Sequence, residues 1–192
     1  MKKLFLIFSW MIVFGISFMF TSYVDAASQR SFKWTNPKGI KTYIPPKHRH
    51  TPMMKRAFAE WSRKTNNKIV FRYVGTKTEA DIVVRYFDKI EDCGETNNAI
   101  GCARYTGHSC TQDVCKFRFV YIDIADNTVG GRDLTDKVEV YTTMLHEIGH
   151  AIGLKHNETN KYSIMSVAPN RSVLKQEIDR DDLNQLAEIY GW

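Results

Sequence analysis

The sequence lacks the features that mark disordered, repetitive or nucleic-acid-binding chains. Charged residues make up 25% of the chain, and no segment after residue 26 is biased enough in composition to stay unfolded. No repeat or linker divides the 192 residues, which suit one domain. The lysines and arginines form no run and no basic face at helical spacing, so the sequence indicates no nucleic-acid partner.

Long apolar runs are also lacking, except at the N-terminus. Lys2 and Lys3 precede an apolar run from Leu4 to Phe20, an order typical of a secretory signal peptide. We therefore predict a signal peptide at residues 1–26 and an exported domain at residues 27–192. The alternative is an uncleaved membrane anchor, because the run is close to the minimum length of a spanning helix. In both cases the domain lies outside the cytoplasm. We expect a secreted, extracellular monomer that touches the membrane only if the anchor remains.

Cysteine is absent outside residues 93 to 115, where four are found: Cys93, Cys102, Cys110 and Cys115. An even number in an exported chain predicts two disulfides, for which three pairings exist. Sequential pairs are favoured because short loops close easily. The alternative is a four-cysteine zinc site, but the spacings lack the short knuckles of such sites.

Acidic residues are fewer than basic ones, and the formal net charge is +6. The simplest interpretation of this mildly basic balance is solubility. Attraction to an anionic cell surface or to an acidic substrate is the alternative.

Residue periodicity predicts a sheet covered by helices. A helix is expected from Thr51, as N-cap, to Lys64, and a second from Asp136, with Glu139 completing a capping box, to the stop at Gly153. A last helix is expected between Asp179 and Gly191. Strands are expected at residues 40–44, 69–74, 80–86, 100–105 and 117–124, with a turn-rich loop at 125–135.

The strongest functional signal is the segment from His146 to His156. His146 and His150 lie one helical turn apart and can bind the same ion, while Gly153 lets the chain turn so that His156 adds a third nitrogen. Three imidazoles leave one position of a tetrahedral zinc open, as in catalytic sites. Glu147 is placed to act on a water there as general base. The motif therefore predicts peptide hydrolysis with one catalytic zinc, and a chance match is on the order of one in 10⁵.

Around this motif the sequence resembles the metzincin metallopeptidases, and within them the matrixins. Residues 163–166 resemble the Met-turn, which would place Met165 beneath the metal. Residues 57–61 with Phe71 and 80–82 resemble the first helix and next strands, and residues 181–191 resemble the last helix. The resemblance covers most of residues 34–191.

The resemblance implies an α+β metzincin (zincin-like) fold: a twisted five-stranded, mostly parallel sheet with three helices. It further implies a zinc endopeptidase that binds an extended substrate peptide along the edge strand at residues 100–105. The wall of the pocket for the residue after the cleaved bond would come from residues 166–172. A rival function is a non-catalytic module that binds peptides or envelope polymers on the same fold.

Several positions depart from the matrixin pattern. Asn157 follows the third histidine, where matrixins usually have serine. We expect the second, structural zinc of the family to be absent, and His48, His50 and His108 to be surface residues. Calcium sites cannot be carried over to single residues, and the acidic candidates are expected to be loop and turn acids: Asp123, Asp126 and Asp133.

Overall fold

A computed structural model describes residues 30–94, 99–111, 113–166 and 177–192. The predicted signal peptide, residues 1–26, lies outside these ranges, as do residues 167–172 of the predicted pocket wall. A search of the described residues for membrane-spanning helices finds none that is long and apolar enough.

Six strands form one sheet in which every pair is parallel except one. The strands are β1 (Ser31–Lys33), β2 (Ile40–Tyr43), β3 (Phe71–Tyr73), β4 (Ile82–Phe87), β5 (Gly101–Thr111) and β6 (Val114–Ala125). The predicted mostly parallel sheet is confirmed. Its five expected strands are β2 to β6, and the three-residue β1 is an addition.

The long strand β6 organises the sheet. Along one edge it pairs with β1 at its start and with β4 at its end. Along the other edge it forms an antiparallel hairpin with β5. Among the described residues β5 pairs with no other strand, so β5 is the edge strand that was expected at residues 100–105.

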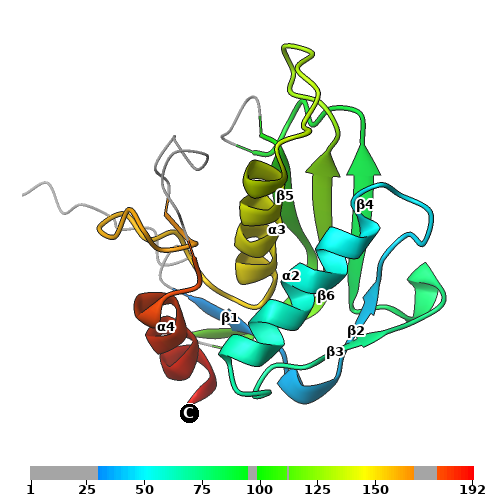
Figure 1. Cartoon of the computed structure of the whole chain (residues 1–192). Coiled ribbons are helices and arrows are strands. Elements are labelled where there is room, and N and C mark those ends of the chain that lie inside the picture. The colour runs from blue at the N-terminus through cyan, green and yellow to red at the C-terminus, as the bar shows by residue number, and fades with distance from the viewer. Residues whose placement is uncertain (1–29, 95–98, 112, 167–176) are drawn as a thin grey trace, which may run out of the picture.

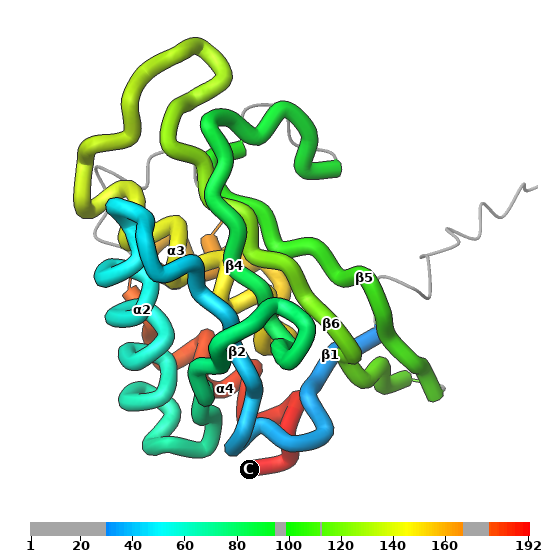
Figure 2. Tube along the Cα trace, turned by 90° about the vertical axis from the view of Figure 1, so that its right-hand side faces the viewer, coloured from blue at the N-terminus to red at the C-terminus, as the bar shows by residue number. Residues whose placement is uncertain are grey.

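Three α-helices accompany the sheet: α2 (Thr51–Lys64), α3 (Lys137–Ala151) and α4 (Arg180–Tyr190). Figures 1 and 2 show α2 and α3 side by side on one face of the sheet. The predicted stripe of α2, Met54, Phe58 and Trp61, is fully buried in this interface. Two short 3-10 turns, η1 (Pro37–Gly39) and η2 (Lys77–Glu79), lie in the connections.

The helix ends confirm some of the predicted caps and correct others. Asp136 caps α3 by accepting from the backbone N–H groups of residues 138 and 139, and Gly191 ends α4 in the left-handed conformation. The prediction of Thr51 as N-cap was wrong. Thr51 is the first residue of α2, and His50 is at the N-cap position. The Thr51 hydroxyl donates to the carbonyl of Pro45 (2.6 Å) and caps no backbone N–H of the helix. The predicted capping box of α3 is only half formed: Asp136 accepts from the N–H of Glu139, but the Glu139 carboxylate accepts from the guanidinium of Arg132 instead of the backbone of Asp136.

Both disulfides follow the sequential pairing. Cys93 is bonded to Cys102 and Cys110 to Cys115, and no cysteine is free, so the four-cysteine zinc alternative is wrong. Cys110 and Cys115 are direct partners in the hairpin. The two strands of the hairpin are therefore longer than the predicted strands at 100–105 and 117–124. The Cys110–Cys115 disulfide joins them near the turn of the hairpin.

Candidate metal centre

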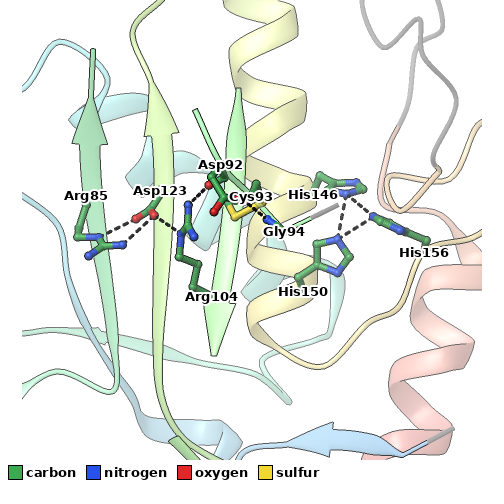
Figure 3. Close-up of a disulfide and its surroundings, with 10 residues drawn as sticks. Arg85, Asp92, Cys93, Gly94, Arg104, Asp123, His146, His150 and His156 are labelled. Atoms are coloured by element: carbon green, nitrogen blue, oxygen red, sulfur yellow. Dashed lines mark hydrogen bonds and ion pairs between the residues drawn. A yellow bond between two sulfur atoms is a disulfide. The ribbon is translucent and has the colours of Figure 1, made fainter. Parts of the chain in front are cut away.

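Three histidines converge beside α3. His146 and His150 project from consecutive turns of this helix, and His156 comes from the loop that follows it (Figure 3). The Nε2 atom of His150 lies 3.1 Å from the Nε2 atoms of both other rings, and those two are 3.3 Å apart. Among the described residues this is the one group of histidine, cysteine and acidic side chains that could hold a metal ion.

The spacing fits a tetrahedral zinc. Nitrogens bound at about 2.0–2.1 Å to such an ion are separated by about 3.3–3.4 Å, close to the observed values. His146 donates from Nδ1 to the carbonyl of Ile164 (2.7 Å) and His150 from Nδ1 to that of Leu154 (2.9 Å). In the neutral rings both Nε2 atoms therefore carry lone pairs, as metal ligands require. Two lone pairs at this distance repel unless a cation lies between them.

The chain leaves α3 through a tight turn at Gly153, which has a φ of +109°. Its N–H donates to the carbonyl of His150 (2.9 Å). A Cβ atom at Gly153 would overlap the backbone oxygen of Phe32. The turn thus needs glycine both for its conformation and for its packing, and it brings His156 back toward the helix.

Aromatic side chains donate hydrogen bonds to carbonyls in and just after the second half of α3. The indole N–H groups of Trp61 and Trp34 donate to the carbonyls of Leu145 (2.9 Å) and Ala151 (2.8 Å). The Tyr190 hydroxyl donates to the carbonyl of residue 152 (2.9 Å). Since these donors come from α2, the segment after β1 and α4, three parts of the chain fix the position of the histidine-bearing helix.

Met165 is buried against α3 at Gly149, the residue before His150. Its side chain is 1% exposed. A Cβ atom on Gly149 of α3 would collide with its sulfur, so glycine at this helical position admits the methionine. The Met165 carbonyl accepts from the N–H of Asn157 (2.8 Å), which ties the turn to the segment of His156.

Asn157, the departure from the matrixin pattern, has a local structural role. Its Oδ1 atom accepts from the N–H and hydroxyl of Thr159 (3.1 and 3.0 Å) and from the N–H of Asn160 (2.9 Å). An asparagine side chain that bonds to the backbone two residues on stabilises a turn. Asn157 therefore shapes the loop after the third histidine.

Asp182 connects the methionine turn to α4, and sequence reasoning gave it no role at the site. Its carboxylate, 2% exposed, accepts from the hydroxyl of Ser163 (2.6 Å) and the N–H groups of Ile164 (3.2 Å) and Asp179 (3.0 Å). The last bond is half of a capping box at the start of α4. The acid three residues after Asp179 is the sequence signal from which this capping role could have been predicted. Burial raises the pKa of Asp182 to about 6.

This raised pKa predicts a distinct pH dependence. The folded state favours protonated Asp182, so its contribution to stability is complete below the ordinary aspartate pKa of about 3.9 and is lost as the pH rises through about 6. Between pH 7 and pH 4 the free energy of unfolding of the wild type should therefore rise relative to that of Asp182→Asn by on the order of 2 kcal/mol. Urea unfolding of both proteins in the metal-free form measures this. A flat difference between the wild type and Asp182→Asn over this pH range would refute the prediction.

Glu147 lies between α3 and the edge strand. The residue is 5% exposed. A Cβ atom built on Gly101 of β5 would be 2.8 Å from its Oε1 atom and 2.7 Å from its Cγ atom, so glycine at the start of β5 makes room for this carboxylate. Further along β5, the hydroxyl of Tyr105 donates to the carbonyl of His150 (3.3 Å). The edge strand thus runs directly beside the histidine cluster.

The remaining histidines are not all surface residues. His50 is only 7% exposed, so that prediction was wrong for this residue. Its Nε2 atom lies 3.2 Å from Asp126, and burial lowers its pKa. His48 stacks on Tyr86, with ring centroids 3.7 Å apart, and bonds to Asp126 (3.0 Å). His108 is exposed, as expected.

The three acidic calcium candidates contact basic side chains. Asp126 and Asp133 accept from the guanidinium of Arg49 (3.0 and 2.7 Å). Asp123 is neither a loop nor a turn acid: it lies in β6, 2% exposed, between Arg85 and Arg104 (Figure 3). Arg85 binds its carboxylate through two nitrogens (2.7 and 2.8 Å). Arginine contacts satisfy buried carboxylates well, which explains how a charged residue occupies this strand.

Comparison with known proteins agrees with this geometry. The family model of the matrixins matches residues 31–191. A probable matrix metalloproteinase of Invertebrate iridescent virus 3 is 27% identical over 146 residues, which are 73% of this chain and 37% of that protein. The metalloendoproteinase 2-MMP of Arabidopsis thaliana is 26% identical over 170 residues, 83% of this chain and 43% of that protein. Metalloendoproteinase 1 of Glycine max is 25% identical over 138 residues, 71% and 44% of the two chains.

Each of these alignments covers less than half of the relative. The family match, in contrast, extends from β1 to the end of α4 and includes the histidine cluster and the methionine turn. The chain belongs to the matrixin family.

Proposed function

We propose that this chain is a secreted zinc-dependent endopeptidase whose zinc is held by His146, His150 and His156. The convergence of three Nε2 atoms within 3.1–3.3 Å supports this assignment most directly. The two Nδ1 hydrogen bonds on α3 add support, because they orient rings as in other histidine-bound metal sites. When bound, zinc supplies Lewis acidity, which makes water more acidic and polarises a peptide carbonyl.

Glu147 is the proposed general base. It neighbours His146 on the same helix, and its buried carboxylate faces the start of the edge strand. From there it takes a proton from the attacking water and passes it to the amine nitrogen that leaves. Glycine at position 101 leaves the space that the carboxylate occupies beside the edge strand.

The substrate is a peptide or protein segment in extended form. One edge of β5 is unpaired among the described residues, and an extended peptide can add to such an edge through backbone hydrogen bonds. The bond between Tyr105 and α3 keeps this edge next to the histidines. The signal peptide proposed for residues 1–26 would export the enzyme to where extracellular proteins are its substrates.

Cleavage of a peptide library by the purified chain tests this function. We expect cleavage that a zinc chelator abolishes and that added zinc restores. A protein that binds one zinc but cleaves none of the peptides would instead support the rival function, a non-catalytic binding module on the same fold. A matched sample of His156→Ala should lose both zinc and cleavage.

A further inference from the structure

The sheet face opposite to α2 and α3 carries a cluster of basic side chains outside the proposed active site. Side chains alternate between the two faces of a strand. On β1 and β6, Phe32 and Phe117 stack on each other on the helix side, so the neighbouring residues Lys33 and Lys116 point to the other face. Arg118 lies at the register shift between β5 and β6, beyond which the alternation along β6 reverses, and its side chain is exposed. Figures 1 and 2 show no described helix on that face.

The strands β2 and β3 add two more basic residues to this face. Lys41 lies between the buried residues Ile40 and Thr42. Arg72 lies between two residues that contact α2, namely Phe71, whose ring packs on Phe58, and Tyr73, whose hydroxyl donates to the carbonyl of Lys55. We name the five residues together the basic sheet face: Lys33, Lys41, Arg72, Lys116 and Arg118. Four are exposed and Lys33 is half-buried.

The charges of the basic sheet face are not balanced within the fold. Lys33 is the direct partner of Lys116 in the pairing of β1 with β6, and Lys41 is the direct partner of Arg72 in that of β2 with β3. Like charges directly opposite each other destabilise a sheet. Among the described residues, none of the five forms an ion pair. Asp81 is the adjoining acid, and its carboxylate accepts from the backbone N–H of Lys41 (2.8 Å).

By contrast, the other arginines of this face are neutralised. Arg85 and Arg104 share the buried carboxylate of Asp123, and the Arg85 guanidinium covers the ring of Tyr121 at 3.8 Å. This end of the sheet is therefore built for stability. The basic sheet face differs: it contains two like-charge pairs, and among the described residues none of its five side chains forms an ion pair.

We propose that the basic sheet face binds an anionic polysaccharide. The five residues lie on β1, β6, β2 and β3, with β4 between β6 and β2. The three strand spacings from β6 to β3, each about 4.8 Å, make a width of about 15 Å. Neighbouring strands of a sheet are rotated by about 20–25° relative to each other. The face is therefore curved, and a flat membrane could not contact the residues of all these strands at once. A flexible polymer can follow the twist and place its repeated acidic groups on successive lysines and arginines.

The other polymers fit less well. An acidic peptide lying across this face would gain no backbone hydrogen bonds, because strand N–H and C=O groups point along the plane of the sheet and not out of its face. Single-stranded nucleic acid relies on open aromatic rings for base stacking. The Tyr121 ring on this face is covered by Arg85 and packs edge-to-face with the half-buried Phe119. Binding to the basic sheet face would be independent of the proposed peptidase site, because the two sets of residues lie on opposite sides of the sheet.

The test measures binding of dextran sulfate, as probe, to the full chain at low salt. The wild type should bind it, should not bind uncharged dextran, and should lose affinity as salt is added. The double variant Arg72→Glu/Lys116→Glu should bind about tenfold or more weakly. Because it converts both like-charge pairs into opposite-charge pairs, its thermal unfolding temperature should be unchanged or higher.

The matched control is Lys55→Glu/Arg56→Glu, which makes the same change in net charge at exposed positions of α2. It should weaken binding by less than about threefold. The milder variant Arg118→Gln should weaken binding in the same direction as the sheet double variant. Equal losses in the two double variants would overturn the proposal, and so would tighter binding to polyglutamate or to vesicles of anionic lipid than to dextran sulfate.

Discussion

Replacement of Glu147 by glutamine is expected to lower kcat/KM for peptide cleavage by about 10³-fold, since general acid–base catalysis contributes about 10²–10⁴-fold. Glutamine preserves the shape of the side chain beside Gly101 but cannot accept the proton. The zinc content should stay at the wild-type value, because Glu147 is not in the group of three side chains that could hold the ion. Steady-state kinetics and elemental analysis of the same sample measure both quantities.

Glu139→Gln is the matched control, because it makes the same substitution on α3. Glu139 pairs with Arg132 on the first turn of the helix, away from the histidines. This variant should keep the wild-type kcat/KM. If Glu147→Gln retained wild-type activity, or if both variants lost it equally, the proposed role of Glu147 would be wrong.

Replacement of Gly153 by alanine is expected to destabilise the protein by roughly 3 kcal/mol or more. A side chain at a φ of +109° costs about 1–3 kcal/mol, and overlap with the backbone oxygen of Phe32 adds a cost of about 1–3 kcal/mol. The turn also separates His150 from His156, so zinc affinity should fall as well. Urea unfolding of the metal-free protein isolates the first effect, and zinc titration measures the second.

Gly131→Ala separates strain from overlap. Gly131 also has a positive φ, +86°, but no atom lies within 4 Å of a Cβ built there. Its substitution should therefore cost only about 1 kcal/mol and leave zinc affinity unchanged. Similar losses in the two variants would show that the contact with Phe32 carries no weight.

The features that could be predicted from the sequence are those set by neighbouring residues. The bounds of α2 follow from Pro52, the apolar stripe and the polar residues after it, and Asp136 and Gly191 mark helix ends by local hydrogen bonding and backbone conformation. His146 and His150 could be placed together because a helix fixes their spacing. The pairing of the cysteines could likewise be predicted from their spacing, because each disulfide closes a short loop.

The features that were missed depend on segments distant in the chain. β1 has only three residues and forms because β6 offers an edge beside β4. Burial of His50 arises where Tyr86 and Asp126 meet it from other parts of the fold. Asp182 could be recognised as a helix-capping acid, but its bonds to Ser163 exist only once α4 docks on the methionine turn. Local pattern contains no information on such contacts.

The most direct measurement of the central claim is peptidase activity during titration of zinc into the metal-free protein. One ion on His146, His150 and His156 predicts activity that rises linearly and reaches its plateau at one equivalent of zinc per chain. The same titration of His146→Ala should yield no activity at that ratio. Full activity in the metal-free protein, or a plateau only at two equivalents, would contradict the single-zinc site.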